Sequence, residues 1–239
     1  MSDTPDISFV IPVFNMESYI GEAISSCLAQ SHRNIEVVVV DDGSTDATPK
    51  VIKHYADGDP RVKPLRVPNG GAGAARNIGC QAASAPLVAL LDADDLCDKD
   101  RAKKTLELHK ANPDAYLSGA AALIDAFNNQ KGQVVPDPFV LERALKENMN
   151  GIVNSTVAFT KSLWEKFKYE EGELARIGID DWQQQLRCAL AGVKFVSTPK
   201  VLSAYRMLQT GISKHRNEER VKELKAAFLK ESGVYAEAA

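Results

Sequence analysis

Three aspartates stand within four residues, directly after a run of apolar residues. The run at 87–91 is typical of a buried strand, and Asp92, Asp94 and Asp95 follow it. Carboxylates this close repel one another, so a bound divalent cation would stabilise the cluster. Carboxylate oxygens are the ligands that Mg²⁺ and Mn²⁺ prefer, and Mg²⁺ often binds through one or two carboxylates plus substrate phosphates. We therefore expect a metal site here, the alternative being an acidic turn that caps the next helix or faces water.

A second acidic loop, residues 41–46, follows the β-branched run at 35–40. Gly43 can adopt a positive φ, and Asp or Ser side chains can close the turn on the backbone. The loop is either a simple Asx-turn or a place where one carboxylate accepts hydrogen bonds from a base or a ribose.

A glycine-rich loop, residues 69–73, leads into a helix. Backbone N–H groups at a helix N-terminus suit a phosphate, and the loop does not match the dinucleotide-binding pattern. Arg76 follows on the helix, where it forms a surface salt bridge, binds phosphate or orders the loop. Phe14 follows the first strand and either stacks on a base or packs in the core.

The second half of the chain offers one more carboxylate pair. Asp180 and Asp181 begin a helix predicted to run to residue 191, where they cap it or provide a general base. Trp182 is a core residue or lines an acceptor pocket. Basic residues at 205–206 and 211–216 form a solvated loop or close over a diphosphate.

Strand and helix patterns alternate in the first half, which predicts parallel βαβ units. The polar clusters must then meet at the carboxyl edge of the sheet, where ligands bind in such folds. The predicted strands lie at 7–13, 35–40, 62–67, 87–91, 116–124, 155–159, 193–196 and 201–205. The predicted helices lie at 20–28, 49–55, 74–83, 99–110, 140–147 and 181–191, with a terminal amphipathic helix from 217.

Composition narrows the class of protein. The chain has 239 residues and a net charge of −3, which gives no support to non-specific nucleic-acid binding. Four cysteines lack metal-binding spacing and are expected to be buried free thiols in a reducing compartment. A secretory signal and a membrane-spanning run are not apparent, so we expect a cytoplasmic protein, with peripheral contact at the inner face of the membrane left open.

Four segments together resemble the family 2 glycosyltransferases: residues 7–15, 37–46, 69–79 and 90–95. The resemblance implies the α/β GT-A fold, with a Rossmann-like, mainly parallel central sheet, helices on both faces and a smaller C-terminal acceptor part. We expect a nucleotide-sugar-binding half at 1–112, an acceptor and catalytic-base half of the same domain at 113–216, and a C-terminal helix at 217–239.

The resemblance also implies roles for single residues. Asp42 would bind a uracil edge, Asp92 would face the ribose or the metal, and Asp94 would ligate Mn²⁺ or Mg²⁺. Asp181 matches the base of an inverting displacement, although Asp180 stands where the family has Glu. The other expected nucleotide contacts are Pro12, Phe14, Asn15, Asn69, Gly73, Arg76 and Ala93. The acceptor or loop candidates are Asp95, Asp180, Trp182 and Arg206.

The predicted reaction is transfer of a single sugar from a nucleotide-diphosphate sugar, with UDP as the expected nucleotide, to a hydroxyl of a saccharide, a lipid-linked or another acceptor. The Q-x-x-R-W motif of processive synthases is absent from the sequence. A nucleotidyltransferase and a catalytically silent nucleotide-sugar-binding domain are the alternatives.

Overall fold

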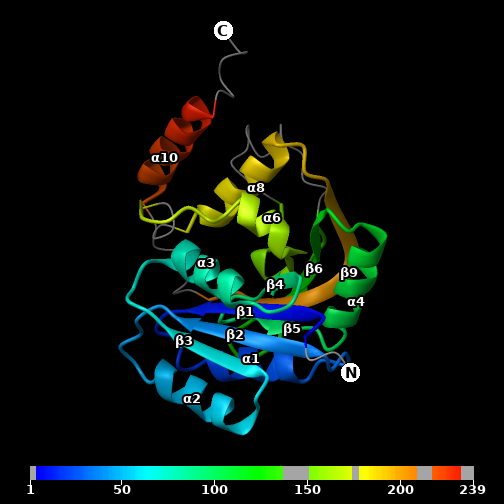
Figure 1. The fold of residues 1–239 in the computed structure, drawn as a ribbon. Coiled ribbons are helices and arrows are strands. Elements are labelled where there is room, and N and C mark those ends of the chain that lie inside the picture. The colour runs from blue at the N-terminus through cyan, green and yellow to red at the C-terminus, as the bar shows by residue number, and fades with distance from the viewer. Residues whose placement is uncertain (1–3, 137–150, 174–177, 209–216, 233–239) are drawn as a thin grey trace.

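The computed structural model describes residues 4–136, 151–173, 178–208 and 217–232, built around one twisted sheet (Figure 1). The strand order is β3-β2-β1-β4-β8-β6-β9-β5, and β7 pairs with β6 beside this path. The predicted helix at 140–147 and the basic segment at 211–216 lie outside the described residues.

The first four strands are parallel, as the alternating pattern predicts. β2 (Ile35–Asp41) is buried along its whole length, which is typical of a central strand covered on both faces. It lies between its partners β1 and β3, and β1 pairs with β4 on its other side. The bounds of these partners are Ile7–Val13 for β1, Val62–Arg66 for β3 and Leu87–Leu90 for β4.

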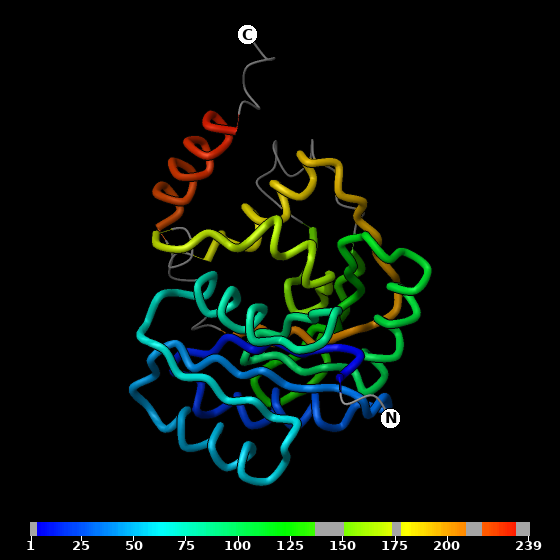
Figure 2. The backbone as a smooth tube through the Cα atoms, in the orientation of Figure 1, coloured from blue at the N-terminus to red at the C-terminus, as the bar shows by residue number. Residues whose placement is uncertain are grey.

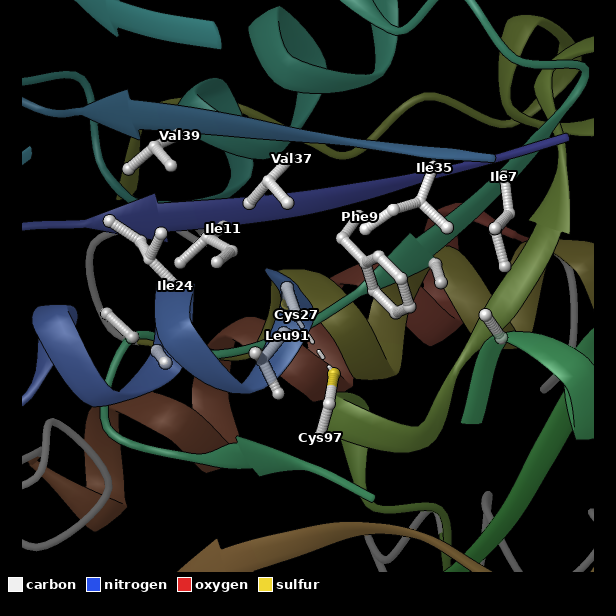
Figure 3. Close-up of a cluster of buried hydrophobic side chains, with 14 of the residues drawn as sticks. Ile7, Phe9, Ile11, Ile24, Cys27, Ile35, Val37, Val39, Leu91 and Cys97 are labelled. Atoms are coloured by element: carbon white, nitrogen blue, oxygen red, sulfur yellow. Dashed lines mark hydrogen bonds between the residues drawn. The ribbon is translucent and has the colours of Figure 1, made fainter. Parts of the chain in front are cut away.

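Helices cover both faces of this parallel part. α1 (Ile20–Leu28) and α2 (Thr48–Gly58) lie on one face and α3 (Ala72–Ala82) on the other (Figures 1 and 2). Alternate residues of β1 point to opposite faces of the sheet. Phe9 packs toward α1 (Figure 3), whereas Val10 packs toward α3. A Cβ at Gly79 would lie 2.4 Å from Val10 Cγ1, so glycine there lets α3 approach the sheet closely.

The second half adds antiparallel pairings. β8 (Ala158–Thr160) runs antiparallel to both β4 and β6 (Tyr116–Ile124), and β6 runs parallel to β9 (Phe195–Arg206). The remaining strands are β5 (Leu96–Cys97) and β7 (Gln130–Val134). The remaining helices are α4 (Arg101–Ala111), the 3-10 helix η1 (Asn154–Thr156), α6 (Lys161–Lys166), α8 (Asp180–Leu190) and α10 (Glu218–Glu231).

Two predictions for this part of the fold need correction, and three of its elements were not predicted. The two short strands predicted at 193–196 and 201–205 are one strand, β9, whose register with β6 shifts around Ala120. Part of the strand predicted at 155–159 is η1 instead, and the strands β5 and β7 and the helix α6 were not predicted. Among the described residues, no helix is long and apolar enough to span a membrane.

Candidate active site

The polar loops that follow β1, β2 and β4 do meet at the carboxyl edge of the sheet. The β1–α1 loop is joined to the β2–α2 loop through Asn15, whose N–H donates to Ser44 Oγ at 2.9 Å and whose Oδ1 accepts from Thr45 N at 2.8 Å. Asn15 adopts a positive φ of 51°, which Asn tolerates better than most residues. In the structure Asn15 therefore orders two loops, and its predicted contact with a nucleotide remains a prediction.

Phe14 and Pro12 lie at the end of β1, beside these loops. The Phe14 side chain is 44% exposed, so it is not the core residue that one interpretation of the sequence allowed. Pro12 is partly buried within β1. An exposed aromatic ring at the mouth of the sheet is suited to stacking on a base.

Asp42 connects the β2 loop to the glycine-rich loop. Its Oδ1 accepts from Gly70 N at 2.8 Å and its Oδ2 from Gly71 N at 2.9 Å, while Asn69 Nδ2 donates to the Asp42 carbonyl at 2.9 Å. The Asx-turn is made by its neighbour Asp41, whose Oδ1 accepts from Ser44 N. Asp42 therefore lies at the N-terminus of α3, where its negative charge interacts favourably with the helix dipole.

This arrangement corrects the predicted phosphate loop. The N–H groups of Gly70 and Gly71, which we expected to bind a phosphate, already donate to the Asp42 carboxylate. Gly73 is not in the loop but buried in the first turn of α3, and Asn69 is exposed beside it. In this structure the anion at the start of α3 is a side chain of the protein itself.

Arg76 is a buried cation between two aspartates. It is 7% exposed, its Nη1 donates to Asp180 Oδ2 at 2.5 Å, and its Nη2 donates to Asp92 Oδ1 at 3.0 Å. The guanidinium also lies over the Tyr169 ring, 5.7 Å from its centroid. The surface salt bridge considered for Arg76 is wrong, because this side chain joins α3 to the acidic turn and to the start of α8.

Asp92 is fixed on its other sides by η1. Its Oδ1 also accepts from Asn154 Nδ2 at 3.2 Å, and its N–H donates to Ser155 Oγ at 3.0 Å. Neither residue was predicted, since Ser155 was assigned to a strand and Asn154 lay just before it. The available signal was the polar run Asn154, Ser155 and Thr156 before an apolar strand. Ala93, the next residue of the turn, is buried.

Asp94 and Asp95 differ sharply in their surroundings. No hydrogen bond or ion pair in the described ranges joins the Asp94 carboxylate to another residue, and burial followed by the charge of Asp92 raises its pKa to about 6. Asp95 is fully buried, its Oδ1 accepts from Arg206 N at 2.7 Å, and burial raises its pKa strongly. Asp95 thus points into the protein and is not available to an acceptor.

A divalent cation fits this turn. Asp94 offers carboxylate oxygens without a protein partner, and the repulsion from Asp92 that raises its pKa is what a cation would relieve. The described residues contain no group of three or more His, Cys, Asp or Glu side chains arranged around a metal. A metal here would therefore be held by one or two carboxylates, with the remaining ligands supplied by substrate phosphates and water.

Arg206 supports the acidic turn from behind. The side chain is 1% exposed; Nε donates to the Asp94 carbonyl at 2.6 Å, Nη2 to Glu22 Oε2 at 2.8 Å and Nη1 to Asn128 Oδ1 at 2.6 Å. It also lies over the Tyr19 ring. Because all of these bonds are made within the protein, the prediction that Arg206 closes over a diphosphate is wrong. Its role is to position the acidic turn.

The first three residues of α8 also occupy different environments. Asp180 is 1% exposed and paired with Arg76, whereas Asp181 is partly exposed and accepts from Trp182 N at 2.7 Å. Burial raises the pKa of Asp181, and the charge of Arg76 opposes that rise. Trp182 is buried, with its ring 5.9 Å from that of Phe228 in α10, so it is a core residue and not part of an acceptor pocket.

The fold matches solved structures that were determined with nucleotide sugars bound. Staphylococcus aureus TarS 1–349, solved in complex with UDP-GlcNAc, aligns over 94% of this chain and 66% of its own with a TM-score of 0.74 at 21% identity. The mannosyltransferase PcManGT of Pyrobaculum calidifontis, solved with GDP-Man and Mn²⁺, aligns over 95% of this chain and 62% of its own with a TM-score of 0.63 at 21% identity. These likenesses establish a GT-A-type fold.

The model of the family "Glycosyl transferase family 2" matches residues 8–167, so the chain belongs to this family. An uncharacterized glycosyltransferase of Haemophilus influenzae is 41% identical over 127 residues, which is 53% of this chain and 51% of that protein. The chain spans about half or less of the length of the first matched curated relatives. The family match confirms the predicted resemblance; it ends before α8, so it does not include Asp180 and Asp181.

Proposed function

We propose that this chain moves a single sugar from a nucleotide-diphosphate sugar to an acceptor hydroxyl with inversion, assisted by Mn²⁺ or Mg²⁺. The observation that carries the proposal is the Asp92–Arg76–Asp180 bridge, in which Arg76 and Asp180 are buried and Asp92 is partly exposed. It ties the acidic turn, on the donor side of the proposed site, to the first residue of α8. The candidate base Asp181 is therefore adjacent to Asp180, which Arg76 links to the acidic turn.

On the donor side, Phe14 would stack on the base and the loops around Asp42 would border it. Asp94, with Asp92, would hold the cation, which would neutralise the leaving diphosphate when bound. A UDP-sugar is proposed because a structural neighbour was solved with UDP-GlcNAc, and a metal because another was solved with Mn²⁺. The sugar and the acceptor are left open by these residues.

On the acceptor side, Asp181 would remove the proton from the attacking hydroxyl. The hydroxyl oxygen would bond to the anomeric carbon as the bond to the diphosphate breaks, and the proton would remain on the Asp181 carboxyl. Its partial exposure leaves a route for the acceptor, and its raised pKa suits a group that must take up a proton. We propose a saccharide, lipid-linked or other hydroxyl acceptor, with action in a reducing, cytoplasmic compartment in keeping with four free buried cysteines.

Calorimetry with UDP, GDP and their sugars, each with Mn²⁺ and with chelator, tests donor binding directly. We expect a uridine nucleotide to bind, and metal to strengthen its binding at least about tenfold, or about 1.4 kcal/mol. Release of free sugar from the bound donor, measured with and without Mn²⁺, tests catalysis. Metal-dependent binding without any turnover would favour the catalytically silent domain, and binding of nucleoside triphosphates with pyrophosphate release would favour a nucleotidyltransferase.

A further inference from the structure

Two of the four cysteines lie against each other in the core below the acidic turn. Cys27 is in the last turn of α1 and Cys97 ends β5, and their Sγ atoms are 3.6 Å apart (Figure 3). All four cysteines are free and buried, but Cys80 and Cys188 belong to the hydrophobic cluster on the other face of the sheet. The fold thus pairs two thiols that stand 70 positions apart in the sequence.

A buried arginine makes the two thiols unequal. Arg101 is fully buried, and its Nη1 donates to Cys97 Sγ at 3.4 Å. Burial alone would raise the pKa of Cys97, but the hydrogen bond with Cys27 and the charge of Arg101 bring it down to about 7. Burial and Cys97 raise the pKa of Cys27 well above its ordinary value. Cys97 is therefore the thiol of the pair that ionises more readily, which suits it to act as the nucleophile, with Cys27 as its partner.

We propose that Cys27 and Cys97 are a redox modification site, a dithiol that reacts with hydrogen peroxide and closes a disulfide between α1 and β5. The Cys97 thiolate attacks the peroxide oxygen, the O–O bond breaks and hydroxide leaves, which gives a sulfenic acid at Cys97. Cys27 then loses its proton to hydroxide and attacks the Cys97 sulfur, expelling a second hydroxide, which takes up the proton that Cys97 released when it ionised and becomes water. In sum, two thiols are oxidised and one peroxide is reduced to two waters.

The surroundings favour closure of this bond with little rearrangement. The sulfur atoms must approach by about 1.5 Å to reach disulfide length. The two segments are already joined, because Cys97 N donates to Ser26 Oγ at 2.9 Å and Gln30 bonds to both the Asp98 carbonyl and Ala102 N at 2.8 Å. The small movement can therefore be shared by the end of a helix and a two-residue strand.

The disulfide would fasten the segment that follows the acidic turn. β5 begins one residue after Asp95, whose carboxylate accepts from Arg206 N, and β5 pairs with β9. A covalent link from β5 to α1 would restrict the unfolded chain across this long loop and so stabilise the fold. This inference depends only on the positions of the thiols, and it holds whichever donor the enzyme uses.

The test is to treat the reduced protein with hydrogen peroxide, quench, unfold it in denaturant and alkylate the remaining thiols. We expect intact mass to show two alkylated cysteines per chain in place of four, and peptide mapping to show the Cys27–Cys97 link within a monomer. The midpoint of thermal unfolding should rise and return to its original value with dithiothreitol. Four alkylated cysteines after oxidation, or Cys97 carried to sulfinic acid without a link to Cys27, would overturn the proposal.

Matched variants identify the two roles. Cys80→Ala/Cys188→Ala should still form the bond, because both residues belong to the cluster on the other face of the sheet and burial raises the pKa of both. Cys27→Ala should stop at the sulfenic acid of Cys97, which dimedone traps, whereas Cys97→Ala should leave Cys27 unoxidised. A Cys27→Ala protein that is folded but gives no dimedone adduct would contradict the assignment of Cys97 as the nucleophile.

Discussion

Two regions at the edge of the sheet hold their carboxylates in contrasting ways. Asp42 is held by two neutral backbone N–H groups of the glycine-rich loop, whereas Asp92 and Asp180 are held by the buried charge of Arg76. Both arrangements are built on α3: Asp42 binds at its N-terminus, and Arg76 lies one turn further along. One short helix therefore positions the loop on the nucleotide side and the bridge toward the candidate base.

The two regions, the loop around Asp42 and the Arg76 bridge, should therefore respond differently to substitution. Each backbone N–H bond to the buried Asp42 carboxylate contributes about 1.5–3 kcal/mol net, because the acceptor is charged although the donor is neutral. Removing one partner of a buried ion pair leaves an uncompensated charge and costs about 3–5 kcal/mol. Substitutions in the bridge should therefore lower the stability of the fold more than substitutions of Asp42, whose main effect should be on binding.

The largest effect should come from Arg76→Met, which leaves Asp92 and Asp180 facing each other without a cation. We expect the free energy of unfolding to fall by about 3–5 kcal/mol, measured by urea denaturation. Adding Asp180→Asn to this variant should restore part of the loss, because one uncompensated charge is removed. The control is Lys53→Met, which removes an exposed ion pair with Asp57 and should change stability little. A fully stable Arg76→Met protein would remove the contrast between the two regions.

Asp181→Asn should have the next largest effect, on turnover alone. As a general base, Asp181 would contribute at least about a hundredfold to the rate, so kcat should fall by that factor while donor affinity and unfolding stay unchanged. Asparagine also serves well near a helix N-terminus, so a cap role predicts little change. Near wild-type transfer by this variant would show that the bridge does not position a base.

Asp180→Asn is the matched control for that experiment. It is adjacent to Asp181 but buried in the bridge, so it should lower stability as well as turnover. If it reduces turnover at unchanged stability and Asp181→Asn does not, Asp180 and Asp181 exchange roles.

In the wild type, metal should raise donor affinity at least about tenfold, or by about 1.4 kcal/mol. Asp94→Asn should abolish this gain while the fold stays intact. In the wild type this gain should weaken as the pH falls through about 6, because a proton then competes with the cation for the Asp94 carboxylate. Calorimetry with Mn²⁺ and with chelator at several pH values measures both effects. Asp95→Asn is the comparison, and a similar loss of the metal effect there would contradict the assignment to Asp94.

The same contrast explains how far the sequence could be interpreted. The strand and helix pattern of the first half was predicted correctly because it is local: β2 is a β-branched run, and Pro49 stands in the first turn of α2. The loops around Asp42 were placed at the right edge because parallel strands bring their carboxyl ends together. Which loop atoms satisfy which carboxylate was not predicted, since an aspartate and a phosphate are equally suited to the start of α3.

The contacts of Arg76 could not be predicted from the sequence. Its partner Asp180 is 104 positions away, and no periodicity or spacing indicates that pairing. Arg206 was misassigned for the same reason: a basic residue late in the chain looks solvent-exposed until the fold encloses it between Glu22 and the acidic turn. Buried charges depend on tertiary contacts, which local patterns do not contain.

The smallest effect should come from Asp42→Ala, which tests the neutral side of the comparison. The variant removes both acceptors of the Gly70 and Gly71 N–H groups, so the glycine-rich loop should loosen and UDP affinity should fall by about 1 kcal/mol, the scale of a net hydrogen bond. The gain in affinity that Mn²⁺ gives should stay the same, because the acidic turn is untouched.

Asp42→Asn, which keeps one acceptor oxygen, separates the two roles of this residue. If Asp42 only orders the loop, the Asn variant should bind UDP nearly as well as the wild type. If its carboxylate also contacts the base, both variants should lose affinity for UDP by similar amounts while their unfolding free energies differ. Unchanged UDP affinity in Asp42→Ala would limit this residue to loop structure and leave base recognition to Phe14 and its neighbours.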